Sequence, residues 1–155
     1  MKKYEFTGET MEVNGSTLNR IVAVRDFADV KAGDKGGWIE REDNLSHYGN
    51  AWVYGDAWVS GDAWVCGNAR VIGNAKVCGD AKVYGNAWVY GNAWVSGDAR
   101  VSGNAEVSGD AKVCGEAKVY GNAVVYGNAW VIGNAKVSGN AWVCGNAEVS
   151  REVSQ

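Results

Sequence analysis

The fold of this chain is decided by a stretch that begins GNAWVYGDAWVS at residues 49–60 and keeps the same six-residue pattern as far as Ser150. The unit, Gly, then Asn or Asp (once Glu), then Ala-x-Val-x, occurs seventeen times without an insertion. Ala and Val alternate with variable residues, which is the period of a β-strand, and the polar dipeptide tolerates the positive φ of a bend. The repeat therefore predicts a strand and a bend in every unit, with Ala and Val inside. It leaves open whether the strands stack in parallel or antiparallel.

Bulk composition agrees with a repeat and gives no sign of an ordinary globular core. The 155 residues suit one domain, with 22 Gly and no Pro, and the net charge of −3 comes from 15 basic and 18 acidic residues. So mild a charge gives no reason to expect binding to nucleic acid or to an anionic membrane. Because no apolar run has the length of a signal peptide or a membrane span, we expect a soluble, cytoplasmic protein.

Residues outside the repeat divide the chain into three parts. Residues 1–43 are expected to form a β cap, in which 12–17 make a hairpin with an Asn14-Gly15 turn and 20–24 form a strand. Residues 44–150 are the solenoid, and residues 151–155 are a charged half-turn that protects the last strand edge. An incomplete first unit at 44–48 aligns His47 with the inward Val position.

Two features resemble known proteins. The unit is similar to the hexapeptide repeat of left-handed β-helix proteins, which implies an all-β fold, a single-stranded left-handed parallel β-helix with 18 residues in each triangular coil. Residues 26–39, DFADVKAGDKGGWI, resemble the cap of a hexapeptide-repeat family of bacteria, phages and prophages that includes YdcK-like proteins. Members of that family are often described as acyltransferases because of the repeat alone. Seventeen units predict five to six coils and a length of about 27 Å at about 4.8 Å per coil.

Every third unit falls on the same side of the triangle, which sorts the outward residues into three faces. The first face is rich in aromatic residues, and each large ring removed from water contributes up to about 4–6 kcal/mol. We therefore expect this face to be buried between subunits, and the resemblance implies a homotrimer. The predicted interface residues are Trp52, Tyr54, Ile72, Trp88, Tyr90, Tyr126 and Trp142.

On the second face, the leading outward position alternates between Trp and Lys along five coils. These residues are Trp58, Lys76, Trp94, Lys112 and Trp130. The alternation permits cation–π contacts and separates the lysines, and this structural interpretation is favoured. The alternative is a ligand strip, because interleaved rings and cations form a platform for nucleobases or nucleotides.

The third face is the most basic, and three of its cations follow a corner acid by two residues. We expect Lys82, Arg100 and Lys118 to neutralise a column of stacked acids, which are Asp62, Asp80, Asp98 and Glu116. Another corner carries only Asn from residue 50 to residue 140, and its amides are expected to bond to one another. The four cysteines, Cys66, Cys78, Cys114 and Cys144, all take outward positions too far apart to pair.

Catalytic residues are scarce. The resemblance implies that an acyltransferase of this fold uses a His base and protruding loops, and that a related carbonic anhydrase uses three His ligands. The chain has one His and no protruding loop, and His47 is interpreted as a buried or cap-facing residue and not as a catalytic base. We expect no enzyme activity, no cofactor and no metal site. The leading hypothesis is a rigid binding or structural module of phage or prophage origin that binds a host protein or a small nucleotide, in counter-defence for example. The alternatives are an acyltransferase-like enzyme that uses coenzyme A at a subunit interface and, last, a DNA mimic.

Overall fold

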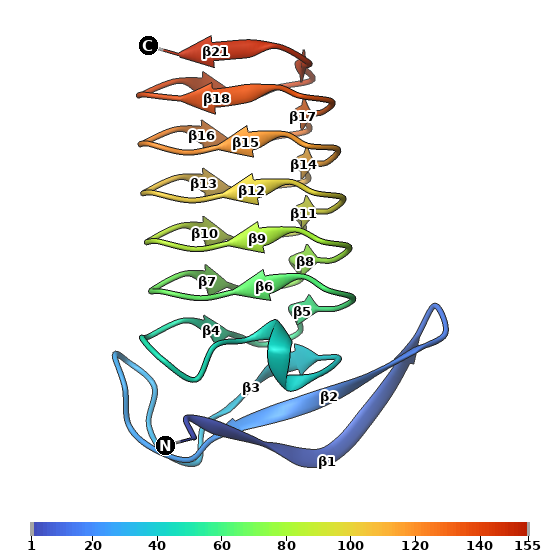
Figure 1. Ribbon diagram of the computed structural model, residues 1–155, viewed down its shortest axis with the longest axis vertical. Coiled ribbons are helices and arrows are strands. Elements are labelled where there is room, and N and C mark those ends of the chain that lie inside the picture. Colours follow the sequence, from blue (N-terminus) through green and yellow to red (C-terminus); the bar gives the residue numbers. More distant parts are fainter. Residues whose placement is uncertain (1, 155) are drawn as a thin grey trace.

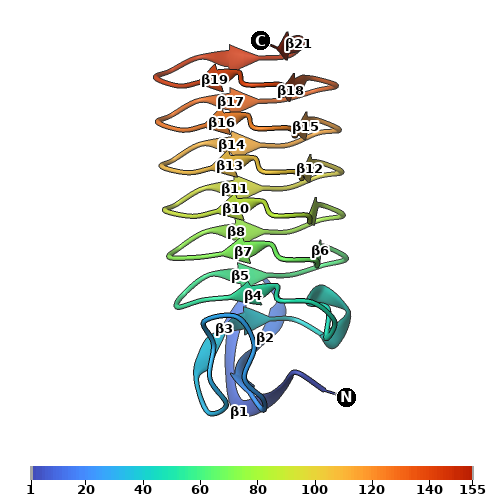
Figure 2. The same cartoon turned by 90° about the vertical axis from the view of Figure 1, so that its left-hand side faces the viewer.

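The computed structural model describes residues 2–154 as a stack of triangular coils with a β-hairpin at its N-terminal end (Figure 1). The two termini lie at opposite ends of the stack, and a view turned by 90° shows the coils lying parallel and evenly spaced (Figure 2). From residue 49 onward no gap or insertion interrupts the described coils, as the uninterrupted six-residue period predicted.

The strands of the coils form three parallel sheets, one on each face. The first face contains β4 (Trp52–Val53), β7 (Arg70–Val71), β10 (Trp88–Val89), β13 (Glu106–Val107), β16 (Val124–Val125) and β19 (Trp142–Val143). The second contains β5 (Trp58–Val59), β8 (Lys76–Val77), β11 (Trp94–Val95), β14 (Lys112–Val113), β17 (Trp130–Val131) and β20 (Glu148–Val149). The third contains β6 (Trp64–Val65), β9 (Lys82–Val83), β12 (Arg100–Val101), β15 (Lys118–Val119), β18 (Lys136–Ser138) and β21 (Glu152–Ser154).

Parallel pairing settles the choice that the repeat pattern left open. Strands pair with the strand 18 residues further along, so that Trp94 lies beside Lys76 on one side and Lys112 on the other. The three-unit coil and the assignment of residues to faces are therefore confirmed, and about six coils are present. The left-handed sense of the coil stays a prediction from the resemblance.

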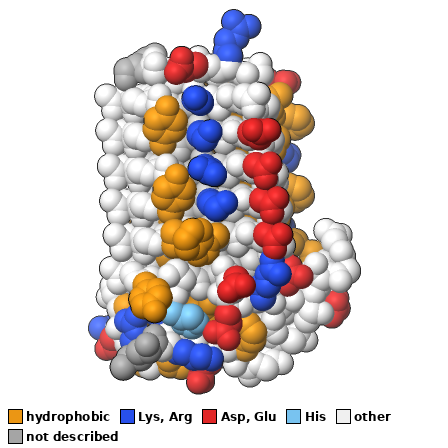
Figure 3. All heavy atoms as spheres, in the orientation of Figure 1, with side chains coloured by type: hydrophobic (Ala, Val, Ile, Leu, Met, Phe, Trp, Pro, Cys, Tyr) orange, Lys and Arg blue, Asp and Glu red, His pale blue; other side chains and the backbone are white. Residues whose placement is uncertain are grey.

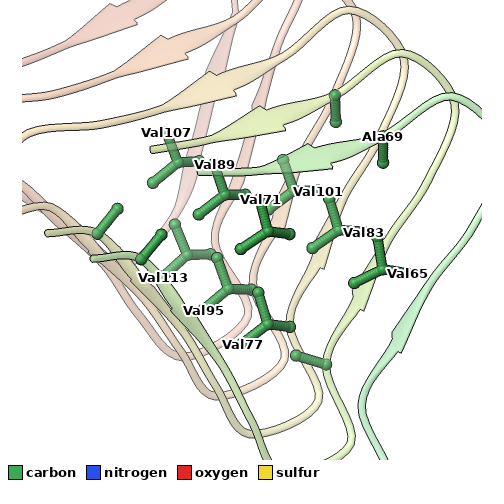
Figure 4. Packing of buried hydrophobic residues seen from close by; sticks show 14 of the residues in the cluster. Val65, Ala69, Val71, Val77, Val83, Val89, Val95, Val101, Val107 and Val113 are labelled. Carbon is green, nitrogen blue, oxygen red and sulfur yellow. The ribbon is translucent and has the colours of Figure 1, made fainter. Parts of the chain in front are cut away.

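The core is a narrow column of Ala and Val side chains. The repeat valines from Val53 to Val137 are completely buried, and they stack in three rows that meet inside the triangle (Figure 4). Small and β-branched side chains fill this bore because larger ones would force the three sheets apart. The prediction that Ala and Val face inward is confirmed along the coils.

Hydrogen bonds between neighbouring coils also fix the corners. Along one corner, each Asn side chain donates its Nδ2 hydrogen to the Oδ1 atom of the Asn 18 residues later, at 3.1–3.2 Å, from Asn68 through Asn140. The predicted amide ladder is confirmed over these residues. Because each amide bonds to the next, the ladder keeps neighbouring coils in register.

The N-terminal segment forms an antiparallel hairpin that joins the second face. β1 (Tyr4–Val13) pairs with β2 (Ser16–Ala23) around Asn14 and Gly15, both at positive φ, so the predicted turn is confirmed. β2 then pairs with β3 (Lys35–Ile39), and β3 runs parallel to β5. The first parallel rung therefore precedes the predicted solenoid start at residue 44, because Trp38 and Ile39 already occupy coil positions opposite Trp58 and Val59.

The first coil also departs from the alignment expected for His47. After a single 3-10 turn, η1 (Glu42–Asn44), Leu45 bridges to Val65 and is buried. Leu45 therefore occupies the inward position that was assigned to His47, and the assignment was wrong. The first coil is two residues longer than the repeat, and a periodic alignment does not detect this change.

The C-terminal residues complete a rung. β21 pairs with β18, with Val153 opposite Val137 and Glu152 opposite Lys136. The expected half-turn at 151–155 thus includes a full strand over the residues described. No helix within residues 2–154 is long and apolar enough to cross a membrane.

Candidate functional site

The alternating side chains of the second face form one continuous strip, which we call the Trp–Lys strip. It consists of Trp58, Lys76, Trp94, Lys112 and Trp130. Lys76 Nζ lies 5.1 Å from the ring centroid of Trp58 and 5.7 Å from that of Trp94. Lys112 Nζ lies 6.0 Å from the Trp94 ring and 5.3 Å from the Trp130 ring. The predicted cation–π contacts are therefore confirmed along the strip.

The strip keeps much of its surface open to solvent. Trp94 and Trp130 are each 42% exposed, although both rings contact lysines. Parallel strands hold the side chains about 4.8 Å apart from coil to coil, so the strip is rigid before any ligand arrives. Rings and ammonium groups arranged in this way can stack on a planar ligand and pair with its negative charge.

The hairpin turns one end of the strip into a cleft. The tip of β1 and β2 stands beside the second face (Figure 1), and a cleft of about 180 Å³ lies between them. Its hairpin wall includes Val13, Asn14 and Ser16, and its solenoid wall includes Lys76 and Trp94. Hydroxyl and amide groups of the hairpin thus face the strip, and they could donate hydrogen bonds to a bound molecule.

Sequence reasoning identified the solenoid wall of this cleft and missed the hairpin wall. The strip is visible in the repeat because its members recur every 18 residues. Val13, Asn14 and Ser16 precede the repeat and share no period with it. Only the angle at which β1 and β2 leave the solenoid brings them next to Trp58 and Trp94, and no local sequence signal encodes that angle.

Only part of the predicted oligomer interface on the first face is exposed on the surface of the chain. Trp52 is 1% exposed because the N-terminal segment covers it, with the Phe27 ring 5.2 Å and the Tyr4 ring 6.2 Å from its own. A Cβ atom at Gly36 would lie 2.7 Å from Trp52 Cζ2, so glycine is required for this close packing. Trp52 therefore belongs to the core of the chain, and its assignment to an intersubunit interface was wrong.

Other residues of the first face remain on the surface. Trp88 is 41% and Trp142 is 68% exposed, and each ring packs edge-on against a tyrosine, Tyr90 and Tyr126 respectively. Tyr54 is half-buried and donates a hydrogen bond to Asp29 of the N-terminal segment at 3.1 Å. Ile72 is also half-buried. The homotrimer stays a prediction, now without Trp52.

His47 is held by the N-terminal segment. Its ring stacks on Tyr4 at 4.1 Å, Nδ1 accepts a hydrogen bond from the backbone N–H of Lys3 at 3.0 Å, and Nε2 lies 2.8 Å from Glu42 Oε1. The hydrogen bond to His47 helps to hold the pKa of the Glu42 carboxyl below its usual value. Both ring nitrogens are therefore engaged in structural contacts, in agreement with a cap-facing role.

Lys3 and the cysteines are the remaining reactive groups of interest. Burial, together with the nearby charge of Arg25, lowers the pKa of Lys3 to about 8, and its Nζ donates a hydrogen bond to the Ala51 carbonyl at 2.6 Å. All four cysteines are free thiols, and burial raises the pKa of Cys66 and of Cys78. Within residues 2–154, no group of three or more His, Cys, Asp or Glu side chains is placed to hold a metal ion.

Together these features define an all-β parallel β-solenoid with a preformed aromatic and basic strip. Residues 63–79, 81–97 and 117–133 match the family model described as YdcK Beta solenoid repeat, so the chain carries repeats of the YdcK type. A further similarity is to a protein of Escherichia coli (strain K12) described as "Uncharacterized acetyltransferase YdcK". The two are 39% identical over 61 residues, which are 34% of this chain and 19% of that protein. The chain thus matches only about a fifth of the relative's length.

Proposed function

We propose that this chain is a non-catalytic binding module whose Trp–Lys strip captures a small aromatic anion such as a nucleotide. The observation that carries the proposal is the position of Lys76. Its ammonium group lies between the rings of Trp58 and Trp94 and lines the cleft beneath the hairpin. One charge and two ring systems are thus held together in a recess that a ligand can enter.

Each group has a defined part in binding. The phosphate of a nucleotide pairs with the ammonium group of Lys76, and its base stacks on an exposed part of the Trp94 ring. Stacking of a base on an aromatic side chain contributes about 1–3 kcal/mol, and a charged hydrogen bond contributes about 1.5–3 kcal/mol. Asn14 and Ser16 in the hairpin wall supply polar groups that a purely flat strip would lack.

A host protein is the second ligand class of the same proposal. A protein surface that presents an aromatic ring next to a carboxylate would meet the same rings and cations. A cytoplasmic location, a phage or prophage origin and a role in counter-defence belong to this part of the proposal. The resemblance of residues 26–39 to a family that occurs in phages and prophages supports the origin and the role in counter-defence, and the four free thiols fit a reducing cytoplasm.

Calorimetric titration with nucleotides tests the proposal. Adenosine and guanosine mono- and triphosphates are titrated into the wild type and into Lys76→Gln, which removes the charge and keeps a polar side chain that can still donate a hydrogen bond. We expect Lys76→Gln to bind at least about tenfold more weakly, since one charged hydrogen bond is lost. Lys136→Gln is the matched control, because it removes the same charge from the third face.

Two results would contradict this proposal. Equal affinity in Lys76→Gln and wild type would exclude the strip as the nucleotide site. Absence of nucleotide binding, together with failure of a Trp94→Ala variant to alter capture of an identified host protein, would exclude the strip for both ligand classes.

An acyltransferase that uses coenzyme A is the second candidate function, favoured by the name of the relative from Escherichia coli. Its site would have to lie at a boundary between subunits. Acetyl-coenzyme A and coenzyme A therefore belong in the same titration. Saturable binding of acetyl-coenzyme A together with transfer of the acetyl group to an amine would favour this candidate over the binding module.

A further inference from the structure

The third face carries two columns of opposite charge that run along the solenoid axis. The basic column includes Lys82, Arg100 and Lys118, at neighbouring positions of β9, β12 and β15, and continues to Lys136 of β18. The acidic column is Asp80, Asp98 and Glu116, at the corner that precedes each of these strands. In the space-filling view a blue and a red column lie side by side with a gap between them (Figure 3).

The two columns do not form ion pairs with each other. Over residues 2–154 no side chain of either column has an oppositely charged partner within 4.0 Å, so the charge balance expected for the corner acids does not come from direct ion pairs within the chain. The three acids and Arg100 are exposed, and Lys82 and Lys118 are half-exposed. Within each column, like charges repeat at about 4.8 Å, an arrangement that is unfavourable until a counter-charge is present.

The N-terminal segment already supplies one such counter-charge. Asp62 lies one coil before Asp80 at the same corner, and the guanidinium of Arg41 binds its carboxylate and also the carbonyl of Gly61. This corner can therefore bind a cationic side chain that belongs to another part of the structure. On the next three coils, the carboxylates of Asp80, Asp98 and Glu116 have no such cationic partner within the described residues.

We propose that a second copy of this chain docks on the third face, with the two solenoids parallel and related by a two-fold axis that runs between the columns. Rotation by 180° about an axis parallel to the solenoid exchanges left and right on the facing surface. The basic column of one protomer then faces the acidic column of the other, and the reverse pairing occurs on the other side of the axis. Such an isologous contact closes after two copies.

The spacing of the charges selects this arrangement. Because both columns belong to the same coils, Lys82, Arg100 and Lys118 of one protomer meet Asp80, Asp98 and Glu116 of its partner at the same height. Three pairs form on each side of the axis. In an antiparallel dimer, related by an axis perpendicular to the solenoid, the two basic columns would face each other and so would the two acidic columns. Like charges would then meet, and the contact would be unfavourable.

Ionic strength provides the first test. The Debye length falls from about 30 Å at about 10 mM salt to about 3 Å at about 1 M, so exposed pairs are strong only at the lower value. We expect light scattering to give a dimer mass at low salt and a monomer mass at high salt. The homotrimer predicted for the first face is the competing assembly. A trimer at either salt concentration, or a monomer at both, would overturn the proposal.

Charge reversal provides the second test. The variant Lys82→Glu, Arg100→Glu, Lys118→Glu has two acidic columns, and Asp80→Lys, Asp98→Lys, Glu116→Lys has two basic columns. Each variant alone is expected to dimerise about 100-fold more weakly than wild type at low salt, because six exposed pairs are lost. Equimolar mixing is expected to restore a dimer that contains one copy of each.

Circular dichroism of each variant establishes that the coils are intact before the masses are compared. Two folded variants that stay monomeric after mixing, while wild type dimerises, would overturn the assignment of the interface to the columns. None of the substitutions touches the Trp–Lys strip, which lies on another face. Nucleotide titration and mass measurement therefore succeed or fail independently.

Discussion

Replacement of a single corner glycine measures how tightly neighbouring coils are stacked. Gly97 has a φ of +63°, and a Cβ atom there would lie 2.9 Å from both the backbone N and the backbone O of Gly115 in the next coil. Gly133 has nearly the same φ, +62°, but a Cβ atom at this position would have nothing within 4 Å. Gly97→Ala and Gly133→Ala therefore introduce the same backbone strain, and only the first introduces a clash.

The magnitudes follow from these two contributions. Alanine in the left-handed region costs about 1–2 kcal/mol, which is the whole expected loss for Gly133→Ala. At Gly97 the neighbouring backbone must also move, and overpacking of this kind typically adds about 1–3 kcal/mol. We therefore expect Gly97→Ala to lower the free energy of unfolding by about 2–5 kcal/mol, and by more than Gly133→Ala.

Urea denaturation, followed by far-ultraviolet circular dichroism and by tryptophan fluorescence, measures both variants against wild type. Using both signals detects any coils that unfold separately, which repeat proteins can do. Equal destabilisation of the two variants would refute the reasoning, because it would mean that contact between stacked corners contributes nothing beyond the strain at a positive φ.

Two further predictions concern the core and the N-terminal segment. Val95→Ala removes two methyl groups from a fully buried site between Val77 and Val113 and should lower the free energy of unfolding by about 2 kcal/mol. Val149→Ala, at a half-exposed site in the last coil, should lower it by less, and the urea midpoints of the two variants test this order. For Lys3, the folded chain releases its proton near pH 8 and the unfolded chain near 10.5, so the unfolded chain binds more protons between these values. The stability of wild type relative to Lys3→Met should therefore rise as the pH increases through this window, and thermal melts at several pH values that give a constant difference would contradict it.

The sequence alone determined the repeating part of the protein. Because every unit places Gly, Ala and Val at fixed positions, one physical solution repeats along the chain. The inward direction of residues such as Val95 follows from that period alone. The three faces, the asparagine ladder from Asn68 and the contacts of Lys76 with two tryptophans also required the three-unit coil, which the resemblance to hexapeptide-repeat proteins implied. The alignment to the repeat failed where the period ended, because Leu45 took the position assigned to His47.

Only the tertiary structure decided how the non-repeating segment packs against the coils. It buried Trp52, which the sequence cannot distinguish from the exposed Trp88, and it brought Asn14 to the edge of the Trp–Lys strip. It also placed Lys82 and Asp80, which are two residues apart in the chain, in columns that form no ion pair with each other over the described residues. A periodic pattern specifies which direction a side chain points, but the neighbours that it meets depend on contacts between distant segments, and these exist only after the chain has folded.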